Sequence, residues 1–279
     1  MQKIGIALGG GGARGLCHIE FIKALDELEL KPSIISGTSI GAIIGSFYAA
    51  GVSGEEMEEL TEKVSLLDIR KMVDLNILSN QGLIKGKGVI DFIDKHLPVK
   101  KFEDLPIPLK IIACEFWNRK EYLFQKGEIL PAIRASISIP GIFEPVMINN
   151  TVLVDGGIIN PVPMNAIRKD CDILIAIDVT GTNEPPKKHP KPSIFESVTI
   201  SFQIMESAFV ENQIADFKPE IYVKPKLVNV QIFDFHKNRK ILESVSDDVK
   251  EFKKKLSSLL DKKPAGFMQK FTWKSKKRK

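Results

Sequence analysis

The chain has 279 residues, of which 43% are hydrophobic and 27% are charged, and its formal net charge is +5. This composition is that of an ordinary globular protein, and the length allows one large α/β domain or two small ones. No apolar run approaches the ~18–20 residues that a membrane-spanning helix needs. The first residues combine a single lysine with a glycine cluster, so we expect no signal peptide and a cytoplasmic protein.

The three cysteines, Cys17, Cys114 and Cys171, share no CxxC spacing, which favours a reducing compartment over a disulfide framework. We expect each of them to be a small core residue rather than a ligand or a nucleophile. The four histidines form no cluster with them at metal-ligand spacing, so the sequence predicts no metal site.

The N-terminal part of the chain alternates between short apolar strands and helices. Residues 3–8 predict a strand that runs into glycine, and residues 16–28 carry apolar side chains at helical spacing. Residues 32–37 predict a second buried strand, and residues 39–50 predict a buried helix that Gly51 ends. This alternation indicates α/β layering with parallel strands.

The middle of the chain is more varied. Short helices are predicted over residues 65–98, and within them residues 79–88 form a candidate mobile loop. An antiparallel pair of strands is predicted at residues 109–125, and a helix follows at residues 128–139.

The rest of the chain completes the same domain. Residues 151–157 predict a strand that ends in a turn, and residues 172–179 predict a fully apolar strand. Residues 180–193, rich in proline and lysine, predict an exposed loop. A helix over residues 194–217, a short strand and an amphipathic helix near residues 240–260 follow.

Residues 10–15 have the pattern GxGxxG, which is typical of dinucleotide-binding loops when it follows a strand and opens a helix. Such a site also needs an acid near the end of the second strand, but here that strand ends in Gly37-Thr38-Ser39. An oxyanion hole is the other interpretation, because successive glycines let several backbone N–H groups point at one spot. A dinucleotide-dependent oxidoreductase is therefore the weaker alternative.

Residues 37–41 have the pattern GxSxG on a predicted strand-to-helix turn. Such a turn holds a serine in a strained, accessible conformation, and the glycines on either side prevent clashes. The alternative is that Ser39 is only the N-cap of the following helix. The strand–turn–helix context and the glycine loop upstream favour a nucleophile.

A nucleophilic serine needs a base. Asp155, at the end of a strand and before two glycines, is the main candidate, and Asp178 is a rival at the end of the next strand. An ordinary Asp-Gly turn would also explain Asp155. None of the four histidines has a supporting motif: His18, His96, His189 and His236.

Three motifs in this order resemble those of the patatin-like phospholipases, and most closely of the small bacterial members. They are Gly-Gly-Gly-x-Arg-Gly at residues 10–15, Gly-x-Ser-x-Gly at 37–41 and Asp-Gly-Gly at 155–157. The similarity covers residues 3–180 well and continues more loosely to about residue 260. It implies a three-layer α/β/α sandwich with a mainly parallel central sheet.

The resemblance also implies an activity, namely hydrolysis of acyl esters in lipids or phospholipids without metal or cofactor, by a catalytic dyad of Ser39 and Asp155. Burial would raise the pKa of Asp155 from ~3.9, which suits a general base at neutral pH. A catalytically silent, membrane-associated lipid-binding protein is the alternative. The oxyanion hole would use the amides of Gly10, Gly11 and Gly12, and the supporting motif residues are Arg14, Gly15, Gly37, Gly41, Gly156 and Gly157.

The C-terminal residues 262–279 differ from the rest. They hold eight of the 40 basic residues and none of the 35 acidic ones, so the positive net charge belongs to them. We therefore divide the chain into a catalytic domain, residues 1–261, and a basic tail. The aromatic and basic side chains of this tail suit peripheral contact with an anionic membrane, where each Lys or Arg contributes on the order of 1 kcal/mol to binding. A solvated tail explains the composition equally well, and we expect no specific nucleic acid partner.

Overall fold

Eight strands form one mixed sheet in the computed structural model, which describes residues 2–62, 85–181, 191–227 and 230–261. The strand order is β5-β6-β3-β2-β1-β7-β8, and β4 pairs with β3. The pairs from β3 across to β8 are parallel, whereas β4, β5 and β6 pair antiparallel. The strands are β1 (Ile4–Leu8), β2 (Ile34–Thr38), β3 (Leu109–Glu115), β4 (Lys120–Phe124), β5 (Val146–Ile148), β6 (Thr151–Asp155), β7 (Ile173–Ile177) and β8 (Ile221–Val223).

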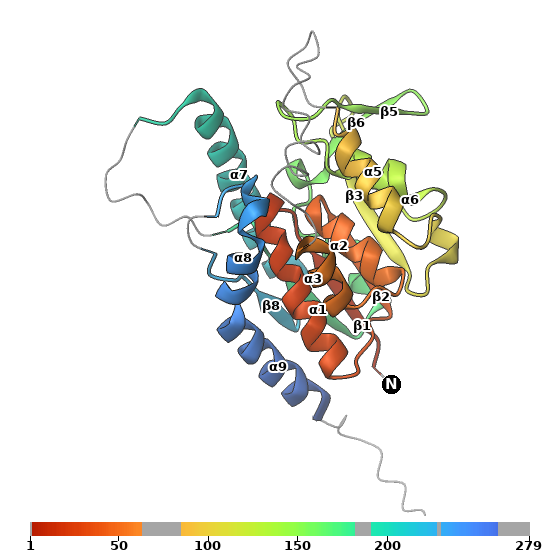
Figure 1. Cartoon of the computed structure of the whole chain (residues 1–279), viewed down its shortest axis with the longest axis vertical. Coiled ribbons are helices and arrows are strands. Elements are labelled where there is room, and N and C mark those ends of the chain that lie inside the picture. The colour runs from red at the N-terminus through yellow and green to blue at the C-terminus, as the bar shows by residue number, and fades with distance from the viewer. Residues whose placement is uncertain (1, 63–84, 182–190, 228–229, 262–279) are drawn as a thin grey trace, which may run out of the picture.

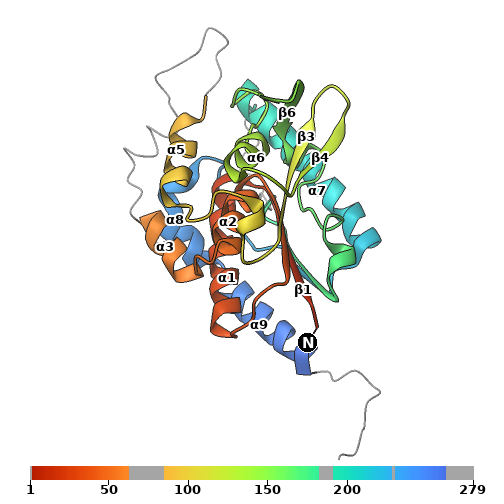
Figure 2. The same ribbon diagram turned by 90° about the vertical axis from the view of Figure 1, so that its right-hand side faces the viewer.

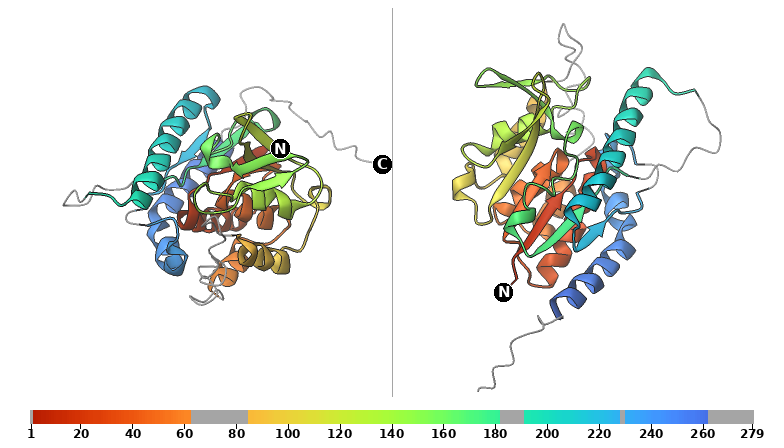
Figure 3. Two further views of the ribbon diagram at one scale, coloured as in Figure 1. Left: turned by 90° about the horizontal axis from the view of Figure 1, so that it is seen from above. Right: turned by 180° about the vertical axis from the view of Figure 1, so that it is seen from behind.

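Helices cover both faces of the sheet (Figure 1). Figure 2 shows α1, α2 and α9 on one side of β1 and α7 on the other, and α7 is seen again from behind in Figure 3. The described helices are α1 (His18–Glu27), α2 (Ile40–Ala49), α3 (Gly54–Glu62), α5 (Lys87–His96), α6 (Ile129–Ser136), α7 (Ile194–Phe217), α8 (Asn238–Ser244) and α9 (Ser246–Asp261).

The two-residue period of β1 divides the core between the faces. Ile4, Ile6 and Leu8 are buried in the larger apolar cluster, which contains the inner sides of α1, α2 and α9. Ala7 points the other way, into a smaller cluster with Val210 of α7. A strand covered on both faces must be apolar throughout, which explains the unbroken apolar sequence of β1. The predicted three-layer α/β/α sandwich is confirmed.

The strand register brings two distant segments together. β2 runs parallel to β3 and ends with Thr38 opposite Ile112. β6 runs antiparallel to β3 and ends with Asp155 opposite Ala113, the next residue of β3. The ends of β2 and β6 therefore meet head to head alongside β3, so the chain leaves both strands at one place in the sheet.

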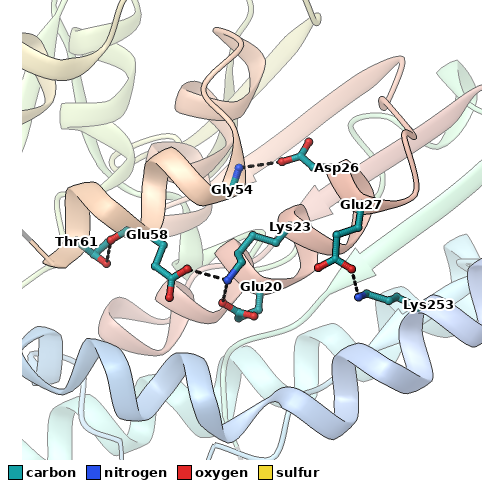
Figure 4. Close-up of polar contacts among 8 residues, drawn as sticks. All are labelled: Glu20, Lys23, Asp26, Glu27, Gly54, Glu58, Thr61 and Lys253. Atoms are coloured by element: carbon teal, nitrogen blue, oxygen red, sulfur yellow. Dashed lines mark hydrogen bonds and ion pairs between the residues drawn. The ribbon is translucent and has the colours of Figure 1, made fainter.

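Polar contacts fasten α1 to its neighbours, as Figure 4 shows. Lys23 lies 2.7 Å from the carboxylate of Glu58 in α3, and Asp26 accepts a hydrogen bond from the amide of Gly54 at 2.9 Å. Lys253 of α9 pairs with Glu27. Asp26 also accepts a hydrogen bond from the hydroxyl of Tyr48, so α1 links the C-terminal helix to the N-terminal half of the chain.

Most predicted elements agree with the structure, with local differences. Residues 12–17 form a tight 3-10 turn before α1, where helical spacing predicts one continuous helix. The predicted helices of residues 65–84, the loop residues 79–84 and 182–190, and the tail lie outside the described residues, so the division at residue 261 stays a prediction. Among the helices that the structure describes, none is long and apolar enough to span a membrane.

Candidate active site

Ser39 occupies the turn between β2 and α2 in a strained conformation, with φ of 55° and ψ of −123°. Its amide donates a hydrogen bond of 2.8 Å to Oγ of Ser136, which in turn donates to the carbonyl oxygen of Ile112. Strain of this kind costs about 1–3 kcal/mol and persists where surrounding contacts enforce it. Ser39 stands at the N-cap position of α2, but its side chain makes no capping hydrogen bond, so capping does not explain why this residue is a serine.

Two glycines make this turn sterically possible. A Cβ atom on Gly37 would lie 2.4 Å from the carbonyl oxygen of Gly41, and one on Gly41 would lie 2.1 Å from that of Leu8. Both distances are far below a van der Waals contact, so only glycine fits at either position. The GxSxG pattern is therefore the steric requirement of a turn that presses α2 against β1.

Asp155, the last residue of β6, lines the same cavity as Ser39. Its Oδ1 accepts the amide of Gly157 at 2.8 Å. Burial raises the pKa of this carboxyl to about 7, although the amide of Gly157 and the nearby side chain of Ser39 act in the opposite direction. A Cβ atom on Gly156 would lie 2.4 Å from the carbonyl oxygen of Ile112, so the first glycine after Asp155 lets the chain pass close to β3.

The glycine loop lies against Ser39. A Cβ atom on Gly10 would come within 3.3 Å of the Cβ of Ser39. The amide of Gly10 donates to the carbonyl oxygen of Pro161 at 2.9 Å, so its predicted place in an oxyanion hole is wrong. The amides of Gly11 and Gly12, which also line the cavity beside Ser39, have no acceptor within the described residues.

Arg14 braces this loop from inside the protein. It is buried, and its Nε donates to the carbonyl oxygen of Gly11 at 3.2 Å. Burial lowers the pKa of the guanidinium, while the charges of Glu206 and Asp178 raise it. Gly15 completes the brace, because a Cβ atom there would lie 2.1 Å from the side chain of Ile40 in the first turn of α2.

The rival bases have other partners. Asp178 accepts hydrogen bonds from the hydroxyl of Tyr222 and the amide of Thr180. His18 is buried with Nε2 bonded to the carbonyl oxygen of Gly9, and burial lowers its pKa to about 4, so it is neutral support for the loop.

The two other described histidines lie elsewhere. His96 contacts the carbonyl oxygen of Phe92 at the end of α5, and His236 lies in a 3-10 turn before α8. His189 is outside the described residues. No described histidine is therefore bonded to Ser39.

Ser39 and Asp155 open into a cavity of about 390 Å³. Its polar lining includes both of these residues, Arg14 and the glycine loop, and the rest is largely apolar. Such a cavity accepts a hydrocarbon chain and delivers its polar end to Ser39. The apolar lining comes from segments far apart in the sequence: Ile139, Ile142, Ile158, Val198, Phe202 and Ile232.

Glu206 of α7 is a member of the site that sequence reasoning missed. It lines the cavity, and its Oε1 is 2.5 Å from where a Cβ atom on Gly157 would be. Burial, together with the charge of Asp155, raises its pKa to about 8, against the effect of Arg14. The available signal was a single carboxylate in an otherwise uncharged stretch, residues 197–210.

Asn160 was also missed. Its side chain bonds to Glu121, Asn165 and Gln213, and its carbonyl oxygen accepts the hydroxyl of Thr38 at 2.8 Å. These bonds tie the segment after Asp155 to the strand that ends at Ser39. Asn160 therefore positions both halves of the site without lining the cavity.

The sequence is similar to those of known proteins of one family. A family model described as patatin-like phospholipase matches residues 6–167. An uncharacterized NTE family protein of Mycobacterium tuberculosis is 34% identical over 193 residues, which cover 69% of this chain and 53% of that protein. A lysophospholipase NTE1 of Kluyveromyces lactis is 25% identical over 266 residues, which cover 87% of this chain but 18% of that protein. The chain thus spans about half the length of the mycobacterial relative and less than a fifth of the length of the yeast one.

A solved structure also resembles the fold. VipD from Legionella pneumophila superposes with a TM-score of 0.48 and 12% identity, over 90% of this chain and 67% of VipD.

Proposed function

The chain belongs to the patatin-like phospholipase family, and we propose that it hydrolyses acyl esters of lipids with Ser39 as nucleophile and Asp155 as general base. The observation that carries this proposal is that the strained Ser39 and a buried Asp155, whose pKa is about 7, line the same cavity. A carboxylate with that pKa is half ionised at neutral pH and is a far better base than an exposed aspartate. The apolar cavity beside the pair supports an acyl chain as substrate.

The proposed reaction has two halves. Oγ of Ser39 attacks the ester carbonyl carbon while Asp155 accepts the hydroxyl proton, and the amides of Gly11 and Gly12 donate to the oxyanion. The intermediate then collapses, and Asp155 returns the proton to the departing alcohol, which leaves an acyl ester on Ser39. Water attacks this ester with Asp155 again as base, and the fatty acid leaves as Ser39 recovers its proton.

The test is intact mass after treatment with a long-chain alkyl fluorophosphonate. We expect one adduct on the native protein and none on Ser39→Ala. Ser207→Ala is the matched control, because Ser207 lies on α7 and bonds to Thr180 without lining the cavity. It should label like the native protein.

Two outcomes would contradict the proposal. An adduct on Ser39→Ala would place the nucleophile at another residue. A folded native protein that takes no adduct would favour the alternative of a catalytically silent lipid-binding protein.

A further inference from the structure

Several large apolar side chains are exposed, and some of them also line the cavity beside Ser39. Three of them, Ile158, Ile194 and Val198, are partly exposed and also line the cavity. Others are Phe116 and Trp117 in the turn between β3 and β4, and Met147 in β5. We call these six residues the apolar rim.

The elements that carry the apolar rim share one end of the molecule although they are distant in sequence. The N-terminal end of α7, β5 and the β3–β4 turn all lie at the top in Figures 1 and 2. The N-terminus and the last turn of α9 lie at the opposite end. The end of the molecule that carries these elements therefore lies away from the last turn of α9.

The exposure of the apolar rim is unusual for a protein surface in water. Ile194 is 87% exposed, Trp117 is 75% exposed and Met147 is 69% exposed. Scattered apolar residues are normal, but large ones gathered around the mouth of a cavity mark a contact surface. Because half of the apolar rim also lines the cavity, an acyl chain could pass from that surface to Ser39 without crossing water.

The chemistry next to the apolar rim identifies the surface. The rings of Phe116 and Trp117 meet edge to face at 5.0 Å, and the exposed Arg119 and Lys120 follow after Asn118. Lys191 is exposed three residues before Ile194. Tryptophan flanked by cations is typical of proteins that sit at the level of lipid headgroups, where the ring is half buried and the cations meet lipid phosphates.

We propose that the apolar rim docks on an anionic phospholipid bilayer, so that the cavity mouth faces the lipid. This inference rests on the proposed function, because docking would bring the lipid ester to Ser39 for hydrolysis. It assigns membrane contact to the end that carries α7, which is not the end at which α9 leads into the basic tail. Binding itself requires no catalysis and can be measured separately.

The first test follows Trp117 itself. The chain has two tryptophans, Trp117 and Trp273, so the protein with Ser39→Ala and Trp273→Phe reports from position 117 alone and leaves lipid intact. Vesicles of phosphatidylcholine and phosphatidylglycerol should shift its emission to the blue, and brominated acyl chains should quench it. Vesicle binding with an unchanged Trp117 spectrum would overturn the proposal, and so would a lack of binding.

The second test compares two double variants on α7 in the Ser39→Ala background. Ile194→Gln with Val198→Gln removes apolar rim residues and should weaken vesicle partitioning by about tenfold or more. Ile204→Gln with Met205→Gln is the matched control, since both residues are exposed but lie at least six residues further along the helix and do not line the cavity. It should change partitioning by less than about twofold. Equal losses in both variants would overturn the proposal, and circular dichroism checks that both fold.

The other occupants of this surface give distinct results. A dimer by light scattering that the Ile194→Gln and Val198→Gln changes convert to a monomer would identify the apolar rim as a self-association surface. Loss of binding on deletion of residues 262–279, with no effect of the apolar rim variants, would assign binding to the tail. Either result would overturn the proposal. Failure of the chemistry is separate, because native protein that docks but does not hydrolyse soluble p-nitrophenyl butyrate contradicts only the proposed function.

Discussion

Burial raises the pKa of Asp155 to about 7, whereas the ordinary value is 3.8. The folded state therefore binds this proton more tightly than the unfolded state, and the stability that the proton contributes is complete below about pH 3.8. It is lost as the pH rises through about 7. The raised pKa on which the proposed role of Asp155 as a base depends thus lowers the stability of the fold at neutral pH.

Asp155→Asn should therefore gain stability relative to the native protein as the pH rises. We expect the difference in melting temperature between the two to grow by about 5 °C or more from pH 5 to pH 8. Differential scanning calorimetry at both values measures it. A difference that does not vary with pH would mean that Asp155 has an ordinary pKa.

Glu206 adds a second ionisation beside the first. Because its pKa is raised to about 8, it is neutral when Asp155 becomes ionised, and above that pH it places a negative charge near the oxyanion. The kcat/KM for a water-soluble ester should rise through about pH 7 and fall above about pH 8. In Glu206→Gln, kcat/KM should still rise through about pH 7 but should no longer fall above about pH 8. An unchanged fall above pH 8 would show that Glu206 does not cause it.

The motifs predicted Ser39 and Asp155 as the reactive pair because each is fixed by a short local turn. They did not predict that the amide of Gly10 is occupied by Pro161, because that contact depends on a loop about 150 residues later in the sequence. Glu206 and Asn160 were missed for the same reason, since only the packing of α7 and β6 brings them near Ser39.

At the scale of elements, α2 packs closely against β1 because Gly41 has no Cβ atom. Gly41→Ala would place a Cβ atom 2.1 Å from the backbone of Leu8, which cannot move without breaking the sheet. We expect a loss of several kcal/mol, of the size seen for severe overpacking, measured by urea denaturation.

Gly45→Ala is the matched control in the same helix. The nearest atoms to its Cβ would be side-chain methyl groups, at 3.2 Å or more. Alanine also has the higher helix propensity, by about 1 kcal/mol. We expect little net change in the free energy of unfolding, and equal losses in the two variants would show that the turn tolerates a side chain.

The local pattern predicted β1, β2, α2 and α7 because their apolar spacing is strong and their ends carry glycine or a capping residue. For α7 the bounds agree, residues 194–217, and Ser193 forms a capping box with Glu196. The sequence did not reveal how β6 meets β3, because strand alternation contains no information about the partner strand. The predicted helix of residues 16–28 begins in the structure only at His18, because Leu16 and Cys17 belong to the 3-10 helix Gly12–Cys17.

At the scale of the whole molecule, α9 belongs to the fold although the family model ends at residue 167. Phe252 of α9 is buried and meets the ring of Phe21 in α1 edge to face at 5.5 Å. Phe252→Ala should lower the free energy of unfolding by about 3–5 kcal/mol. Lys253→Ala should lower it by less than about 1 kcal/mol, because its pair with Glu27 is partly exposed to solvent.

Urea denaturation of both variants makes this comparison. Similar small losses would mean that α9 is an appendage and that the folded unit ends before it. A large loss confined to Phe252→Ala would support one cooperative domain up to residue 261.

The head-to-head meeting of β2 and β6 has a consequence for synthesis in the cell. Ser39 leaves the ribosome long before Asp155, and the two come together only after β6 has paired along β3. Under the proposed function, a nascent or partly folded chain would hold the nucleophile without its base and would stay inert toward the lipids of its own cell until the central sheet is complete.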